Sequence, residues 1–247
     1  MKLYNDLAEY YYEIEKPGRQ IQEEISFILN VFSKYQVKSS LDFGCGSGEH
    51  VNALKDHIAI TGIDISNAMV EVAKKRFPGC NFLQGDLRSF QNHTKVDSLI
   101  CMFGTFNYMI DDEEIVTSLK NLSENLKTNG IAVFEIWSIY PIQKIKRKPI
   151  SPVSLSRVGD LMIKRNRGFK ISTGVDGIEN IVEVNFIFNL DKKVIKDKHK
   201  MRVFSENEFQ IHLQSAGFDL LENFGNFKME NFSHTTGRML LVCKKKD

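Results

Sequence analysis

A glycine-rich run beside an aspartate has the residue types and spacing to hold a small polar ligand. Residues Leu41–Gly48 read LDFGCGSG, with Asp42 followed by Gly44, Gly46 and Gly48. Glycines permit positive φ and let the backbone approach a ligand closely. The G-x-G-x-G spacing differs from the G-x-G-x-x-G of dinucleotide binders, and no Gly-Lys-Ser/Thr follows to form a phosphate-gripping loop. Alone, the run predicts either a ligand contact or merely a tight strand-to-helix turn.

Two further carboxylates suit a nucleoside. Asp64 follows Gly44 by 20 residues in GIDIS, and Asp86 lies in GDL. A carboxylate after the second strand can accept both hydroxyl protons of a ribose. Asp86 can accept a proton from an exocyclic amine, and Leu87 offers a backbone N–H and an apolar side chain. Each aspartate alone could be an ordinary loop residue, and Asp64 a helix cap. Together, three successive loops describe an adenosine-shaped pocket.

The elements that must position these residues alternate between helix and strand. Hydrophobic spacing predicts helices over 20–34, 66–76 and 111–127, and strands over 37–43, 58–65, 81–84, 96–103 and 131–137. We expect Ser66 to cap the second helix and Asn129-Gly130 to end the third. This alternation predicts an α/β fold with a doubly wound, mainly parallel sheet.

The pattern changes after Trp137 to a period of two. Val182, Val184, Phe186 and Phe188 are apolar on alternate positions, which predicts an antiparallel strand with one wet face. We expect 160–172 and 194–204 to pair with it, making 140–203 a small β insertion for substrate or oligomer contacts. A capping box at Ser205 predicts a helix to residue 216. Strands 218–224 and 238–243 then complete a seven-stranded Rossmann-like sheet built from 1–139 and 204–247, with 1–19 as a lid.

Composition excludes several protein classes. The chain has 247 residues, of which 42% are hydrophobic and 26% charged, as in ordinary globular proteins. No apolar run approaches the ~18 residues of a membrane span, and the acidic, tyrosine-rich start is no secretory signal. The four cysteines fit no zinc spacing, so we expect no metal site and instead buried thiols in the reducing cytoplasm: Cys45, Cys80, Cys101 and Cys243.

Charge is distributed unevenly along the chain. Residues 1–143 carry 13 Lys/Arg against 19 Asp/Glu, a net −6, whereas residues 144–247 carry 20 against 12, a net +8. Two basic runs, Lys144–Lys148 and Lys192–Lys200, account for much of the excess. Such runs are either solvated surface or a field that attracts an anionic substrate, such as a phosphorylated small molecule.

The series LDFGCGSGEH, GIDIS, QGDL and VDSLICMF resembles a class I S-adenosylmethionine-dependent methyltransferase. Asp42 and the glycines that follow it match the E/D-x-G-x-G-x-G pattern of that family. More narrowly, the chain resembles the bacterial N-methyltransferases of nucleotide-linked (dTDP) amino sugars. That likeness rests on the tyrosine-rich start leading into Gly18-Arg19, on MFGTFNY, on Glu135-Ile136-Trp137, and on the final GRMLLV.

The resemblance implies a place for each part of S-adenosylmethionine, whose product would be S-adenosylhomocysteine. The adenosine is expected at the ribose acceptor Asp64, the adenine-packing Ile65, and the adenine-edge residues Asp86 and Leu87. The methionine moiety is expected against the backbone of Gly44 and Gly46, the carbonyl of Met102, the guanidinium of Arg19, and a lid formed by Tyr10.

The acceptor is the least determined part of this interpretation. Trp137 is followed by Ser138, where the amino-sugar enzymes often carry a pair of aromatics. The Asp/Asn-Pro-Pro-Tyr/Phe signature is absent after the fourth strand, which argues against nucleic acid as the acceptor. Candidates for a catalytic base are Tyr10, Tyr108 and His199, although water could also take the proton. We expect a small, anionic substrate and no membrane partner, and the resemblance allows a homodimer.

Three other hypotheses stay open at this point. The same fold could methylate an oxygen or carbon nucleophile or a different amine, such as an amino acid. It could bind S-adenosylmethionine without catalysis, although the intact set of Asp42, Asp64 and Asp86 disfavours this. It could methylate RNA, in which case binding would depend steeply on salt.

Overall fold

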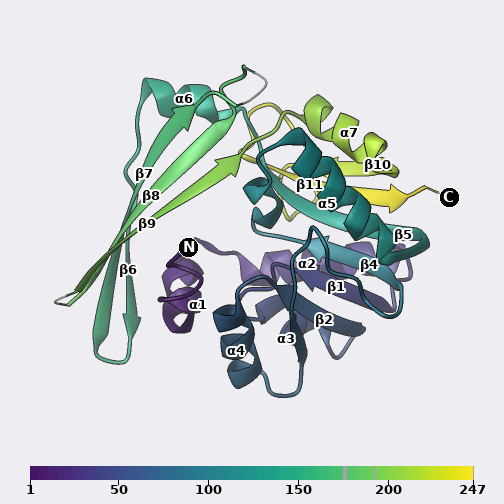
Figure 1. The fold of residues 1–247 in the computed structure, drawn as a ribbon, viewed down its shortest axis with the longest axis horizontal. Helices are drawn as coiled ribbons and strands as arrows, with labels where there is room; N and C mark the ends of the chain where they lie inside the picture. Colours follow the sequence, from purple (N-terminus) through teal and green to yellow (C-terminus); the bar gives the residue numbers. More distant parts are fainter. Residues whose placement is uncertain (175–176, 192, 247) are drawn as a thin grey trace.

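A computed structural model of the protein describes residues 1–174, 177–191 and 193–246, and it contains two sheets (Figure 1). The larger has seven strands in the order β10-β11-β5-β4-β1-β2-β3, all parallel except β11, which is antiparallel to both of its neighbours. Its strands are β1 Ser39–Phe43, β2 Ala59–Asp64, β3 Asn81–Gln84, β4 Val96–Cys101, β5 Leu126–Trp137, β10 Phe218–Phe224 and β11 Arg238–Lys245. The predicted doubly wound fold is confirmed.

Helices cover both faces of this sheet, since each turns an apolar stripe inward. One face is covered by α5 Asp112–Glu124 and α7 Glu206–Ser215. The other is covered by α2 Ile21–Lys34, α3 Glu49–Leu54 and α4 Asn67–Arg76. The predicted caps are present: Ser66 Oγ accepts from the Met69 N–H, and Ser205 with Glu208 forms a capping box. Covering both faces leaves the carboxyl ends of the strands as the open edge.

The prediction for the end of α5 is wrong. We expected a helix over 111–127 stopped by Asn129-Gly130, but α5 ends at Glu124 and β5 begins at Leu126. Leu126 is fully buried and pairs with Val96, so burial draws this segment into the sheet. Asn129, at φ 61°, lies in an irregularity of the β4–β5 ladder.

The smaller sheet is antiparallel, in the order β6-β7-β8-β9, and we call it the insert sheet. Its strands are β6 Val153–Val158, β7 Leu161–Ser172, β8 Ile181–Leu190 and β9 Lys193–Arg202. The predicted alternation is confirmed, because Val182, Val184, Phe186, Phe188 and Leu190 are all buried. Strand β6 and helix α6 (Pro141–Arg147), which carries most of the first basic run, were not predicted. Lys192 of the second run lies outside the described residues.

The N-terminal segment lies between the two sheets (Figure 1). It consists of η1 Ala8–Tyr10, α1 Tyr11–Glu15 and η2 Lys16–Gly18. Leu3, Leu7 and Ile14 pack in one core cluster with the apolar face of β8. This packing joins the insert sheet to the open edge of the large sheet.

Two composition-based expectations can be compared with the structure. Cys45, Cys101 and Cys243 are buried, but Cys80 is partly exposed, and all four thiols are free. Cys80 differs because it follows the end of α4, at the surface edge of the core. In the part of the chain that the structure describes, no helix is long and apolar enough to cross a membrane.

Candidate active site

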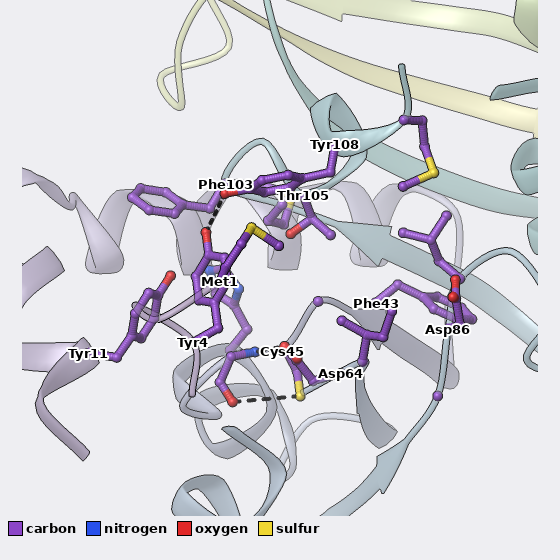
Figure 2. A pocket seen from close by; sticks show the side chains of 18 of the residues that line it. Met1, Tyr4, Tyr11, Phe43, Cys45, Asp64, Asp86, Phe103, Thr105 and Tyr108 are labelled. Atoms are coloured by element: carbon purple, nitrogen blue, oxygen red, sulfur yellow. Dashed lines mark hydrogen bonds between the residues drawn. The ribbon is translucent and has the colours of Figure 1, made fainter. Parts of the chain in front are cut away.

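A cavity of about 280 Å³ opens at the carboxyl ends of the parallel strands, where ligands bind in this type of sheet. Its two ends differ in chemistry (Figure 2). Asp64 and Asp86 lie toward one end, and Tyr4, Tyr11 and Tyr108 gather at the other. The lining therefore offers oxygen acceptors at one end and phenol groups at the other.

The glycine run forms the part of the wall between β1 and α3. Gly44 and Gly46 have φ of 76° and 54°, a region that favours glycine. A Cβ on Gly44 would lie 2.4 Å from the Thr105 side chain, and one on Gly46 would lie 3.3 Å from the Tyr11 ring. Glycine is required here because the turn is crowded and left-handed, and the backbone itself lines the cavity.

Asp64 lies at the end of β2 with its carboxylate held in place. Oδ2 accepts the N–H of Gly46 at 2.9 Å, and Oδ1 accepts that of Ser66 at 2.8 Å. Burial raises the pKa of Asp64, and these two bonds oppose that rise. Each oxygen keeps a second lone pair for a ribose hydroxyl. Ile65 is 55% exposed beside it, an apolar surface that a flat ring would cover.

Asp86 already has a cationic partner. Arg88 Nε donates to both of its carboxylate oxygens at 2.9 Å, and Arg88 Nη1 reaches Glu114 at 2.8 Å. Burial would raise the pKa of Asp86, but the hydrogen bonds from Arg88 lower it overall. Asn121 fixes the adjacent loop by donating to the Leu87 carbonyl at 2.9 Å. Sequence reasoning missed Arg88, although its position two residues after Asp86 was a usable signal.

Arg19 lines the cavity, and its guanidinium group already has a carboxylate partner within the protein. It forms a buried ion pair with Glu24 and lies 4.8 Å from the Phe103 ring centre. His50 Nε2 is 3.0 Å from the same Glu24 carboxylate. Burial disfavours the charged forms of both Glu24 and Arg19. The hydrogen bonds from His50 and Arg19 nevertheless bring the pKa of Glu24 down to about 2. The same Glu24 carboxylate raises the pKa of Arg19. Glu24 and His50 were not foreseen, because they lie on α2 and α3, far apart in sequence.

Asp42 lies beneath the cavity floor, 1% exposed, and its Oδ2 has no hydrogen-bond partner among the described residues. His50 Nδ1 lies 4.0 Å from this oxygen. Burial raises the pKa of Asp42 to about 6. A buried carboxylate oxygen without a partner favours a ligand that brings a positive charge nearby.

This burial makes Asp42 a source of pH-dependent instability. Its pKa is higher in the folded chain than the ordinary 3.8, so stability is lost as pH rises from about 4 to about 6. At ~1.36 kcal/mol per unit, the cost approaches about 3 kcal/mol. We expect the ligand-free Asp42→Asn variant to gain about that much relative to wild type between pH 4 and pH 7, measured by urea unfolding. Parallel stability–pH curves would contradict this assignment.

A chain of hydrogen bonds runs from the phenol groups at the aromatic end of the cavity to buried residues behind them. The Tyr4 and Tyr108 hydroxyl groups are hydrogen-bonded (Figure 2), with their oxygens 2.7 Å apart. Tyr108 Oη is also 2.7 Å from His199 Nδ1. His199 Nε2 is 2.9 Å from Asp197 Oδ2, which also accepts the Leu3 N–H at 2.8 Å. The carboxylate takes the Nε2–H, so Nδ1 of the neutral ring accepts the Tyr108 O–H. The Tyr108 oxygen in turn accepts the Tyr4 O–H.

Burial sets the protonation states along this chain. It raises the pKa of Tyr108 and Tyr4, so both phenols stay protonated. It lowers the pKa of His199, although Asp197 opposes this. Burial raises the pKa of Asp197, but the bonds from Leu3 and His199 outweigh it. A neutral imidazole therefore lies behind a phenol that faces the cavity.

Most of the residues expected from sequence lie together at the cavity, and three do not line it. The lining includes Arg19, Gly44, Gly46, Asp64, Ile65, Asp86, Leu87, Met102 and Tyr108. The Met102 carbonyl accepts the Thr105 N–H at 3.2 Å and keeps a lone pair. Asp42 lies below the floor, and His199 lies behind Tyr108. Tyr10 packs half-buried in the N-terminal core instead, and Tyr4 and Tyr11 take the positions we had expected for it.

Known proteins share both the motifs and the fold. A family model described as a methyltransferase domain matches residues 41–130. A dTDP-3-amino-3,4,6-trideoxy-alpha-D-glucopyranose N,N-dimethyltransferase of Streptomyces venezuelae is 31% identical over 186 residues, covering 74% of this chain and 76% of that protein. The chain belongs to the class I S-adenosylmethionine-dependent methyltransferases. It is therefore an S-adenosylmethionine-dependent enzyme that methylates a small molecule.

Solved structures agree with this methyltransferase fold over nearly the whole chain. An S-adenosylmethionine-dependent methyltransferase from Clostridium acetobutylicum ATCC 824 superposes with a TM-score of 0.81 at 18% identity, over 99% of both chains. DesVI of Streptomyces venezuelae superposes at 0.76 with 23% identity, over 96% of this chain and 97% of that one. Both likenesses include the insert sheet, since they span its residues.

The cavity of this methyltransferase fits S-adenosylmethionine. The crowded left-handed glycines leave bare backbone for the methionine part, and the Asp42 oxygen without a partner suits its positive charge. The carboxylate of Asp64 suits the ribose, and exposed Ile65 suits the base.

Proposed function

We propose that this methyltransferase transfers methyl groups to the amine of a nucleotide-linked amino sugar. The observation that carries the proposal is the phenol of Tyr108, which lines the cavity and is hydrogen-bonded to buried His199. Such a pair suits an acceptor that must lose a proton to become nucleophilic. Three relatives are named as N,N-dimethyltransferases of dTDP-linked amino sugars, which supports the acceptor class. The net +8 of residues 144–247 suits an anionic acceptor.

We assign the larger sheet's residues, 1–139 and 204–247, to S-adenosylmethionine binding and 140–203 to acceptor recognition. When bound, S-adenosylmethionine supplies a methyl group activated by its sulfonium. Asp64 and Asp86 orient the adenosine, and the Gly44–Gly46 backbone holds the methionine part. Most of the rate then comes from positioning in a site that excludes water.

The proton of the acceptor amine leaves through residues of this chain. The Tyr108 oxygen has a lone pair that can accept it while the Tyr108 O–H passes its own proton to His199 Nδ1. Asp197 stabilises the resulting imidazolium at 2.9 Å from Nε2. Tyr4 holds Tyr108 in place through the 2.7 Å bond between their oxygens.

The test is a methyl-transfer assay with matched acceptors. We expect S-adenosylhomocysteine release, and one or two added methyl groups by mass spectrometry, with dTDP-linked 3-amino or 4-amino deoxysugars. The corresponding dTDP-linked hydroxy sugar should not react, because it lacks the amine. Transfer to trans-aconitate or an amino acid, but to no nucleotide-linked amine, would contradict the proposal. A separate arm with RNA should show no transfer.

A further inference from the structure

Two arginines interrupt the apolar face of the insert sheet. In the β7–β8 ladder, Arg165 pairs with Phe188 and Arg167 with Phe186, so both arginines share a face with these buried rings. Residues two apart on a strand point to the same side. Arg165 contacts Glu15 of α1, which places this face toward the N-terminal segment.

In the described part of the chain, a carboxylate contacts only one of the two guanidinium groups, that of Arg165. Arg165 is buried, forms an ion pair with Glu15, and donates from Nε to Ser154 Oγ at 3.1 Å. Arg167 is half-buried, and its buried Nε has no hydrogen-bond partner among the described residues. Since buried charge is costly unless it is paired, this excess positive charge favours an added anion.

Glu15, the partner of Arg165, connects this arginine pair to the aromatic end of the cavity. Glu15 follows Tyr11 by four residues on α1, one turn and about 6 Å along the helix axis. Tyr11 lines the cavity, with its ring centre 5.7 Å from that of Tyr4. An acceptor held at Tyr4 and Tyr108 could therefore extend toward Arg167.

We propose that Arg167, supported by Arg165, binds the diphosphate of the acceptor. This inference rests on the proposed function, because a nucleotide-linked sugar carries a diphosphate beside its sugar. A guanidinium carries its N–H donors in a planar fork that matches two phosphate oxygens. Arg167 is half-buried, so its side chain is partly open to solvent although its Nε is covered, and the Glu15–Arg165 pair holds its surroundings fixed.

The first test is calorimetric titration with inorganic diphosphate in the presence of S-adenosylhomocysteine. We expect wild-type binding to weaken about 10- to 100-fold in Arg167→Gln, the loss of charge-assisted hydrogen bonds. Arg167→Lys should retain part of the affinity. The matched control is Lys164→Gln, because Lys164 lies on the exposed face of the same strand, and it should bind like wild type. Arg165 is left intact, since removing it would leave Glu15 unpaired.

The second test separates this site from the proposed function. With a dTDP-linked amino sugar, we expect Arg167→Gln to raise KM about 10- to 100-fold at nearly unchanged kcat, and Lys164→Gln to leave both unchanged. If Arg167 controls diphosphate binding but no nucleotide-linked amine is methylated, the site stands and the proposed acceptor is wrong. If such amines are methylated with equal KM by wild type and Arg167→Gln, the diphosphate site is overturned. Equal diphosphate binding by both proteins would also overturn it.

Discussion

Asp64→Ala is expected to abolish useful binding of S-adenosylmethionine. The carboxylate offers two ribose-facing lone pairs and also holds the N–H groups of Gly46 and Ser66 at 2.9 and 2.8 Å. Charge-assisted hydrogen bonds are worth about 1.5–3 kcal/mol each, so losing two weakens binding at least about 100-fold. Calorimetric titration with S-adenosylmethionine and S-adenosylhomocysteine measures this directly.

The control must separate ligand loss from misfolding. Asp56→Ala removes an exposed carboxylate near the start of the same strand and should bind both ligands like wild type. Circular dichroism and the unfolding midpoint of Asp64→Ala should remain those of a folded protein. An affinity within about threefold of wild type would show that Asp64 does not hold the ribose.

Tyr108→Phe is expected to lower kcat about 100-fold or more while leaving the affinity for S-adenosylhomocysteine unchanged. General bases contribute about 10²–10⁴-fold, and this variant removes the hydroxyl that connects the cavity to His199. The pKa of His199 is lowered by burial, so wild-type activity should fall only as pH drops below its ordinary 6.5. Below its lowered pKa the His199 imidazole is protonated and can no longer accept a proton. Tyr108→Phe should therefore lack this fall in kcat at low pH, the acid limb of the pH–kcat profile.

Two matched variants sharpen the result. Tyr10→Phe makes the same chemical change in the N-terminal segment but outside the cavity lining, and should keep wild-type kcat. Asp197→Asn retains the shape of the chain but weakens the acceptor behind His199, and should lower kcat less than Tyr108→Phe. If Tyr108→Phe retains wild-type kcat and the same acid limb, water rather than this pair takes the proton.

The alternation of helix and strand could be predicted from the sequence because the helical period and the two-residue period of a strand are both local patterns. Caps at Ser66 and Ser205, and the apolar stripe of β8, depend on residues within a few positions of each other. The end of α5 could not be predicted from local patterns. Asn129-Gly130 is a good helix stop, but pairing of buried Leu126 with Val96 outweighed that local preference.

The cofactor half of the site follows from sequence for a related reason. Asp64 ends a parallel strand, and Gly44 and Asp86 lie within two residues after the ends of two others. Such strand ends meet at one edge of the sheet whatever the details of packing. The acceptor half depends on contacts between distant segments. Tyr4 and Asp197 are far apart in the chain, and neither has a local pattern that marks it.

By itself, then, the sequence determined the doubly wound fold, the glycine turn and the carboxylates at the strand ends, since the succession of helices and strands and the chemistry of the loops are encoded by neighbouring residues. Only the tertiary structure decided that Tyr108 contacts His199, that Tyr4 and Tyr11 rather than Tyr10 line the cavity, and that Glu15 pairs with Arg165 on the sheet face that also carries Arg167. Those choices depend on how the insert sheet packs on the N-terminal segment. That packing buries a shared apolar face and is specified by no single stretch of the chain.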